Sequence, residues 1–463
     1  MIKIMKPIIK NILYVSTVAV FAACNVIKPY QKPIAKSAGL FRDYESKDTA
    51  TIAKLHWKEI FPDTILQRLI SEGILHNIDL QKTYSITRQA QAYFDQSKLA
   101  YFPVISADAA LALSGSSNPQ AFSTSTKTHI YSAEFTASWE ADVWGKLKSA
   151  KKAQLASLLQ STANARAVQT SLVADIANNY YNLLALDQQL EITEQSVQDW
   201  QITVNVMKSL KVANVVTGAA IVQSEASKYA VEVTIPDLKM SIWQTENIIN
   251  LLLGRPSGSV SRAKIVTEQA VTLLDPGVPS QMLANRPDVM AAEYAFRNAF
   301  ELTNVAQAYF YPSLTLTGSG GYSSVKSFFG VGSLIGNLAA GITQPIFNQG
   351  ANITRLTVAK EQQQQALLNF QYTVLSAGQD VSNAMMSYKT AMEKAATRVY
   401  QIESLKKSVN YTQQLVRYGS ANYTEVLTAQ QNLLAAQLNG VNDRLQRLQA
   451  IVYLYRALGG GWQ

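Results

Sequence analysis

The side chains that most often carry out chemistry in proteins are few in this sequence and stand apart from one another. His56, His76 and His129 are the only histidines, and their spacing matches neither a metal site nor a catalytic triad. The run GVGSLIG, Gly330 to Gly336, misses the dinucleotide-binding pattern by one residue and lies in a predicted strand hairpin rather than before a helix. The sequence therefore predicts no enzyme, no metal site and no cofactor.

One residue does predict covalent chemistry, because Cys24, the only cysteine, ends an export signal. Lys3, Lys6 and Lys10 precede the apolar run NILYVSTVAVFAA, which is short for a membrane-spanning helix and typical of a signal for export. The run ends in FAAC, which resembles a bacterial lipobox, so Cys24 is predicted to carry a thioether-linked diacylglycerol. Asn25 at the next position favours the outer membrane. The alternative is a chance cysteine after an ordinary export signal.

The charge of the chain is basic but dispersed. The formal net charge is +9, and Lys and Arg are scattered among Asp and Glu without forming a basic stripe. This distribution predicts a solvated basic surface and no nucleic-acid partner.

Two halves of the chain carry the same pattern. Asn77 to Pro103 and Asn285 to Pro312 each read as a helix closed by a proline. The two segments share Asp, Arg and Pro at one constant separation, at positions 79, 88 and 103 in the first and 288, 297 and 312 in the second. The sequence therefore predicts an internal duplication.

Each of these prolines precedes an alternating strand, and a Gly/Ser/Thr/Asn-rich loop leads to a second strand. In YSAEFTASWEADV, from Tyr131 to Val143, apolar residues occupy the odd positions and polar or small residues the even ones. Such a strand suits a boundary between hydrocarbon and water, with Tyr131, Trp139 and Trp144 as an aromatic girdle and Ser132, Glu134, Thr136, Ser138 and Glu140 facing water. Four strands cannot close a barrel, so copies of the chain must pair their edges. A soluble sandwich is the alternative, and the export signal and the small number of strands count against it.

Each hairpin is followed by a long helical pattern without proline, Lys146 to Lys211 and Ala351 to Arg417. A Gly-containing break and a returning helix follow, Ala219 to Leu253 and Tyr423 to Leu458. Each long pattern could reach roughly 100 Å and has a narrow apolar stripe, which predicts antiparallel helical rods that pack on neighbours and keep a wet face.

The chain resembles the TolC-like outer-membrane factors, and within them the lipoprotein branch, over nearly all of its mature length. The motifs that carry the resemblance are LLGRPSG from Leu252, NRPDV from Asn285, YFYPSLTLTG from Tyr309, QPIFNQG from Gln344 and YGSANYTEVLTAQQNLLAAQ from Tyr418. The resemblance implies an α+β membrane protein that forms a homotrimer. Each copy would give four strands to a twelve-stranded barrel in the outer membrane and its helical hairpins to an α-barrel in the periplasm.

The resemblance also divides the chain into domains. They are a lipoprotein signal peptide (1–23), an N-terminal anchor and equatorial segment (24–73), a first repeat (74–253) with a strand hairpin at 103–144 and a helical hairpin at 146–253, an equatorial linker (254–281), a second repeat (282–458) with a strand hairpin at 312–347 and a helical hairpin at 351–458, and a C-terminal tail (459–463).

The family carries a carboxylate constriction with a pattern similar to V-D-V-L-D-A, and TEVLTA stands at that place here. Glu425 takes the first acidic position, Thr428 replaces the second acid, and Gln223 is the counterpart of Thr428 in the first repeat. The resemblance implies three Glu425 carboxylates near a threefold axis, which would repel one another and attract cations. Taken alone, Glu425 is a first-turn glutamate, favourable near a helix N-terminus.

The resemblance implies partners as well. A periplasmic adaptor protein would dock on the helical tips, at Thr217, Gly218, Tyr418, Gly419 and Ser420. An inner-membrane RND-type pump would supply the energy, since no phosphate-binding loop is found in the sequence. The predicted protein is a passive efflux conduit, lipid-anchored in the outer membrane and extending into the periplasm. Two alternatives stay open: a duct for type I protein secretion, and a structural coiled-coil lipoprotein without a pore.

Overall fold

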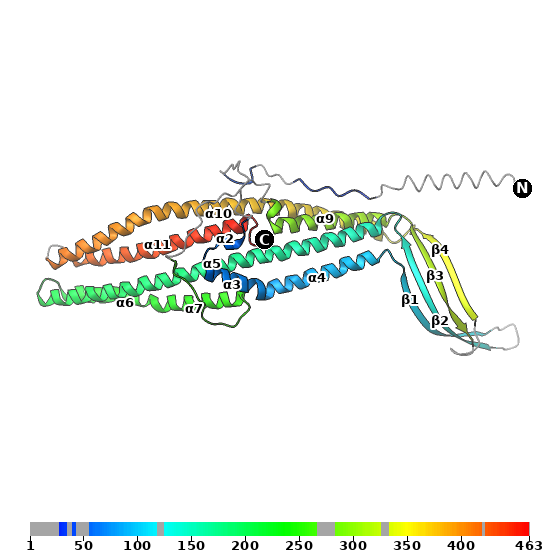
Figure 1. The fold of residues 1–463 in the computed structure, drawn as a ribbon, viewed down its shortest axis with the longest axis horizontal. Helices are drawn as coiled ribbons and strands as arrows, with labels where there is room; N and C mark the ends of the chain where they lie inside the picture. The colour runs from blue at the N-terminus through cyan, green and yellow to red at the C-terminus, as the bar shows by residue number, and fades with distance from the viewer. Residues whose placement is uncertain are drawn as a thin grey trace. The chain divides into compact units, whose positions relative to one another are not determined.

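The fold combines long helices with one β-sheet, which confirms the α+β class (Figure 1). The computed structural model describes residues 27–34, 39–42, 55–117, 125–265, 283–325, 333–418 and 422–462. The elements in chain order are α2 (Trp57–Ile60), α3 (Thr64–His76), α4 (Ile78–Leu99), β1 (Val104–Ser117), β2 (Ser125–Ala141), α5 (Lys146–Val212), α6 (Gly218–Glu232), α7 (Thr234–Leu252), α9 (Pro287–Ala308), β3 (Ser313–Ser324), β4 (Ser333–Thr343), α10 (Ala351–Arg417) and α11 (Tyr423–Ala457).

The chain divides into two compact units. The first consists of residues 1–34, 86–161 and 291–370, and the second of residues 35–85, 162–290 and 371–463. The first unit therefore contains the sheet with the helix ends that lead into it. The second contains the greater part of the helical hairpins with the segments that pack around them.

The four strands form one antiparallel sheet in the order β1-β2-β3-β4 (Figure 1). Residues paired across neighbouring strands share a face, because side chains alternate along each strand. Ala137 of β2 lies opposite Ile105 of β1 and Gly318 of β3, and Gly318 lies opposite Leu338 of β4. The alternating apolar positions of all four strands therefore fall on one face. That face is open to solvent in the single chain, with Leu338 79% and Phe135 66% exposed.

The opposite face is lined mainly by small and polar residues, with Val104, Ile130 and Ile335 as its larger apolar side chains. Thr136 lies opposite Ser106 on one side and Ser319 on the other. The hydroxyl oxygens of Ser106 and Thr136 are 2.6 Å apart and share a hydrogen bond. Glu134 and Glu140 alternate with Phe135 and Trp139, so their side chains belong to this polar face. The sheet thus has one apolar and one polar surface along its whole width.

The sheet is open at both sides. Among the described strands, β1 pairs only with β2 and β4 pairs only with β3. One edge of β1 and one edge of β4 therefore have backbone N–H and C=O groups without ladder partners in the single chain.

Asp142 caps the N-terminal end of α5, which at 67 residues is as long as α10. Its Oδ1 accepts from the backbone N–H of Leu147 at 2.9 Å, and its Oδ2 accepts from that of Lys148 at 2.8 Å. Asp142 thus satisfies two of the first-turn N–H groups that have no partner within the helix. Gly145 just before α5 has a φ of +70°, and a Cβ there would overlap the side chain of Ile27. The strand-to-helix turn therefore requires glycine for its backbone angle and for its packing.

The helices pair as two hairpins in the second unit. The ribbon of α10 runs beside that of α11, and the ribbon of α5 beside that of α6 (Figure 1). Arg398 of α10 bonds Asp443 of α11 at 2.8 Å, and Lys208 of α5 pairs with Glu225 of α6 at 2.9 Å. None of the described helices combines the length and the apolar composition that a membrane-spanning helix needs.

The returning helix of the first hairpin differs from the sequence expectation. One helix was expected from Ala219 to Leu253, but α6 ends at Glu232 and α7 begins at Thr234. The cause is Pro236, which has no N–H to donate to the carbonyl one turn earlier and whose ring crowds that carbonyl. A proline in the first turn of a new helix is well tolerated, so the chain restarts there.

An extended N-terminal segment lies along α9 in the first unit. Asn304 exchanges two hydrogen bonds with the backbone of Lys28, at 3.4 and 3.1 Å. The ring of Tyr30 packs against Phe300 with centroids 5.6 Å apart. Lys32 pairs with Glu293 at 2.7 Å. The predicted signal peptide and Cys24 lie outside the described residues, so acylation of Cys24 stays a prediction.

Candidate functional site

The two helical hairpins meet at one end of the second unit. A small apolar cluster joins them there, with Met207 of α5, Ala220 of α6, Val416 of α10 and Val426 of α11 buried together. Partly buried Leu210, Val216, Ile221 and Tyr423 pack on this cluster. Because this cluster contains residues from α5, α6, α10 and α11, the described ends of these four helices form one end surface.

The three residues predicted for the constriction lie at this end. Glu425 is in the first turn of α11, and Asn422 caps that turn by accepting from the N–H of Thr424 at 3.1 Å. Glu425 and Thr428 are both exposed and, three residues apart, lie on one side of the helix. Gln223 of α6 is joined to α11, since its Oε1 accepts from the Tyr423 hydroxyl at 3.2 Å. The structure therefore brings Gln223 close to the helix that carries Glu425 and Thr428.

The predicted adaptor-contact residues lie on the same end surface where the structure describes them. Thr217 is the N-cap residue of α6, Gly218 is its first residue, and both are exposed. A Cβ at Gly218 would meet open space, so the backbone can be approached closely there. Tyr418, just after α10, is 83% exposed. Gly419 and Ser420 lie outside the described residues.

The predicted girdle residues occupy two kinds of position. Tyr131 and Trp139 are both in β2 on the apolar face, and eight residues of strand separate them by about 27 Å. The indole N–H of Trp139 donates to the carbonyl of Tyr101 at 2.8 Å. Trp144 lies beyond the end of β2, where it stacks on Tyr311 and donates to the carbonyl of Pro312 at 2.6 Å. Trp144 therefore ties the end of the first hairpin to the start of the second.

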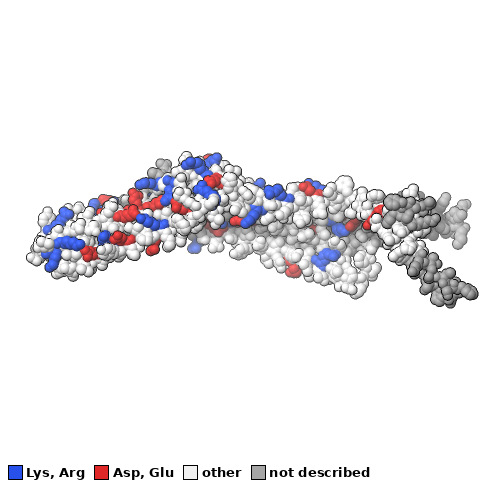
Figure 2. Space-filling view, turned by 90° about the horizontal axis from the view of Figure 1, so that it is seen from below, with Lys and Arg blue, Asp and Glu red and all other residues white. Residues whose placement is uncertain are grey.

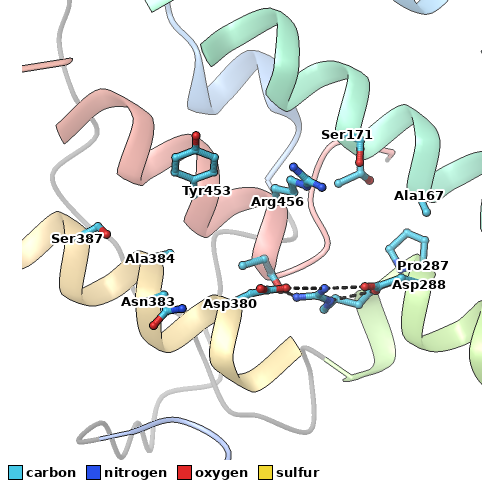
Figure 3. Close-up of a pocket in the computed structure, with 13 residues that line it drawn as sticks. Ala167, Ser171, Pro287, Asp288, Asp380, Asn383, Ala384, Ser387, Tyr453 and Arg456 are labelled. Carbon is cyan, nitrogen blue, oxygen red and sulfur yellow. Dashed lines mark hydrogen bonds and ion pairs between the residues drawn. The ribbon is translucent and has the colours of Figure 1, made fainter. Parts of the chain in front are cut away.

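The motif NRPDV forms an ionic cluster around the buried side chain of Arg286, and the sequence did not predict the members of this cluster. Arg286, 8% exposed, binds Asp288 through two hydrogen bonds of 3.0 and 2.6 Å and Asp380 through one of 3.0 Å. It also donates to the carbonyl of Ala457 at 2.9 Å. Figure 3 shows the two carboxylates on opposite sides of the guanidinium. One side chain thus joins the start of α9, the middle of α10 and the end of α11.

The electrostatics of this cluster favour its charged form. Burial alone would raise the pKa of Asp288, but the hydrogen bonds and the charge of Arg286 lower the pKa below its ordinary value. A cavity of about 420 Å³ lies beside the cluster, lined also by Ser171 of α5, Asn383 of α10 and Arg456 of α11 (Figure 3). The sequence offered only the motif itself as a signal, since Asp380 and Ala457 are far from it along the chain.

Charges of both signs are interspersed on the face that Figure 2 presents, and no continuous field of one sign covers it. Among the described residues, no group of three or more His, Cys, Asp or Glu side chains is arranged to hold a metal ion. The end surface carries the exposed Glu425, Thr428 and Gln223 together with the exposed cations Lys211 and Arg417.

The sequence of this chain is similar to those of known proteins over most of its length. The family model described as "Outer membrane efflux protein" matches residues 69–255 and 278–460. The "Cation efflux system protein CusC" of Escherichia coli is 28% identical over 451 residues, which cover 95% of this chain and 96% of that protein. The "Probable outer membrane lipoprotein SilC" of Salmonella typhimurium is 28% identical and covers 98% of this chain and 99% of its own length.

Solved structures agree with the fold. A crystal structure of CusC, 26% identical, superposes with a TM-score of 0.84 and covers 95% of this chain and 100% of its own. The open state of the Neisseria gonorrhoeae MtrE outer membrane channel, also 26% identical, gives a TM-score of 0.85 with coverage of 95% and 99%. The outer-membrane channel OprN, at 23% identity and a TM-score of 0.87, agrees in fold alone.

Proposed function

Because this chain belongs to the outer membrane efflux protein family, we propose that three copies of it form one passive duct across the outer membrane. An inner-membrane RND-type pump and a periplasmic adaptor would deliver substrates to the helical end of the duct. The strands would carry them through the membrane. Relatives are named for efflux of cations, of toluene and of antibiotics. Since these cargoes differ although each relative matches at least 95% of this chain, we assign the choice of substrate to the pump.

The observation that carries the proposal is the open, two-faced sheet. Its apolar face is exposed, and β1 and β4 each lack a partner on one side among the described strands. In a bilayer, each backbone group left unpaired costs several kcal/mol, so the edges must be satisfied by other copies. Two copies would supply eight strands and three would supply twelve. The family resemblance favours three.

The end surface of the second unit fits the role of the closed mouth. In a trimer, three exposed Glu425 side chains would gather near the axis. Their carboxylates would repel one another and attract cations from solution. Thr428 stands one helical turn further along α11, where a second acid would double the charge. The exposed Thr217, Gly218 and Tyr418 would then receive the adaptor.

Conductance measurements test the proposed function. The purified protein is expected to produce unitary current steps in a planar lipid bilayer, because a closed barrel with a polar interior conducts ions. A coiled-coil lipoprotein without a pore would give no unitary current steps at any protein concentration. That result, obtained with protein shown to be folded and inserted, would remove the conduit from consideration.

The mouth gives a further prediction. Glu425→Ala is expected to lower the K⁺ over Cl⁻ permeability ratio and to enlarge the resting conductance, because the ring loses three fixed charges and their side chains. Thr428→Asp is the matched opposite variant, expected to raise that ratio because it doubles the number of carboxylates. Reversal potentials in a KCl gradient measure both. Identical reversal potentials for the wild type and both variants would make Glu425 an ordinary first-turn glutamate.

A further inference from the structure

The first two turns of α5 have an unusual charge distribution. Lys146, Lys148, Lys151 and Lys152 fall close together, and the first turn of this described helix contains no acidic residue. The N-terminal end of a helix carries partial positive charge, so cations there are unfavourable unless something compensates them. Lysines at a helix end that disfavours positive charge indicate a binding partner of opposite charge.

Only two of the four lysines are compensated by the chain itself. Lys146 pairs with Glu140 at 2.5 Å, and Lys152 lies 3.7 Å from the buried carboxylate of Glu301. Within the described parts of the chain, no carboxylate lies within ion-pair distance of Lys148 or Lys151. These two lysines are three residues apart and lie on one side of α5. The carboxylate of Asp142 caps this helix end by accepting from the backbone N–H groups of Leu147 and Lys148. The ammonium groups of Lys148 and Lys151 therefore remain without an ion-pair partner of their own in the described chain.

Lys151 of this pair lies beside Tyr101, whose backbone is joined to the apolar face of the sheet. The Lys151 Nζ is 5.6 Å from the ring centroid of Tyr101, and the carbonyl of Tyr101 accepts the indole N–H of Trp139. Trp139 is on the same strand face as the exposed Phe135. Phe102, beside Tyr101, is 66% exposed. Cationic, aromatic and exposed apolar groups therefore meet where the sheet joins the helices.

We propose that Lys148 and Lys151, with Tyr101 and Trp139, bind the phosphate of an anionic phospholipid headgroup. The inference rests on the proposed function, because an apolar sheet face in hydrocarbon places Trp139 at the level of the headgroups. The lysine stems run along apolar surface while their ammonium groups donate charge-assisted hydrogen bonds to phosphate oxygens. The ring of Tyr101 holds Lys151 at that level through a cation–π contact. The site thus prefers a phosphatidylglycerol-type lipid over a zwitterionic one.

Native mass spectrometry of the purified full-length protein tests this site. Phosphatidylglycerol is titrated against the wild type and against Lys148→Gln/Lys151→Gln, with phosphatidylcholine as the zwitterionic comparison. The double variant is expected to bind phosphatidylglycerol about thirtyfold more weakly, since each lysine near an anionic headgroup contributes roughly five- to sixfold. Binding of phosphatidylcholine is expected to change little. Lys148→Arg/Lys151→Arg is expected to keep the affinity of the wild type.

Two controls separate the site from general effects of charge. Lys389→Gln/Lys406→Gln removes two exposed lysines of α10 in the second unit and is expected to leave the lipid preference unchanged. Inorganic phosphate at millimolar concentration is expected not to displace phosphatidylglycerol, because it lacks acyl chains for the apolar face. Displacement by phosphate would overturn the assignment to a lipid.

Other outcomes also decide the matter. Equal lipid affinity in the wild type and the glutamine variant overturns the inference. Loss of the oligomer with unchanged lipid affinity overturns it as well, because the lysines would then pair with acids of a neighbouring copy. If the variant fails this test but still gives unitary current steps, the proposed function stands and only the lipid site falls.

Discussion

Leu338→Arg is expected to destabilise the protein in a bilayer by about 2–4 kcal/mol, the cost of a cation on the lipid face of a barrel near mid-membrane. Leu338 is central in β4, 79% exposed in the single chain, and opposite Gly318 on the apolar face. Asn337 precedes Leu338 in β4, so its side chain lies on the polar face at nearly the same depth. Asn337→Arg is therefore the matched control, expected to cost much less because its guanidinium remains in water.

The measurement is urea-induced unfolding in phospholipid vesicles, with insertion into the vesicles recorded separately. The expected order of stability is wild type, then Asn337→Arg close behind, then Leu338→Arg clearly lower. The reverse order for the two variants would mean that the face carrying Leu338 meets water, which contradicts a lipid-facing apolar surface. A wild type that folds but does not insert into the vesicles would support a soluble sandwich. Equal losses would mean that the sheet does not separate two environments.

Arg286→Met is expected to cost about 2–4 kcal/mol in the free energy of unfolding. The substitution keeps most of the volume of the side chain but removes the cation that binds Asp288, Asp380 and the Ala457 carbonyl. Removing one partner of a buried ion pair costs about 3–5 kcal/mol, and the loss here is smaller because Asp288 and Asp380 are 41% and 49% exposed and keep part of their hydration.

Chemical denaturation in detergent measures the effect, with Arg68→Met as the control. Arg68 is exposed on α3 and its replacement is expected to change stability by less than about 0.5 kcal/mol.

The pH dependence of the free energy of unfolding is a second measurement of the same cluster. The pKa of Asp288 is lower in the folded protein than its ordinary value of 3.8, so the stabilisation is full above that value and is lost as the pH falls through the folded pKa. The wild type is expected to lose this contribution in acid, and Arg286→Met is not. Parallel pH curves for both proteins would contradict the role of the cluster.

The order of elements could be predicted from the sequence because the signals are local. The alternation of apolar and polar residues along a strand can be recognised from neighbouring residues alone. This pattern placed Phe135 and Trp139 on one face and Glu134 and Glu140 on the other. The long helices α5 and α10 were equally accessible, since their apolar stripes run without proline from one end to the other. The break before α7 was missed because Pro236 was treated as part of one continuous helix.

Local patterns along the chain were enough to predict the class of the fold and the two faces of the strands, and the motifs were enough to predict the family. Tertiary structure alone decided the rest. The register across β1 to β4 aligned the apolar faces into one surface, and packing brought Asp380 and Ala457 to Arg286 and Tyr101 to Lys151. The physical reason is that helix and strand periods act over a few residues. Contacts between residues distant along the chain depend instead on how the elements pack, and no local pattern encodes that.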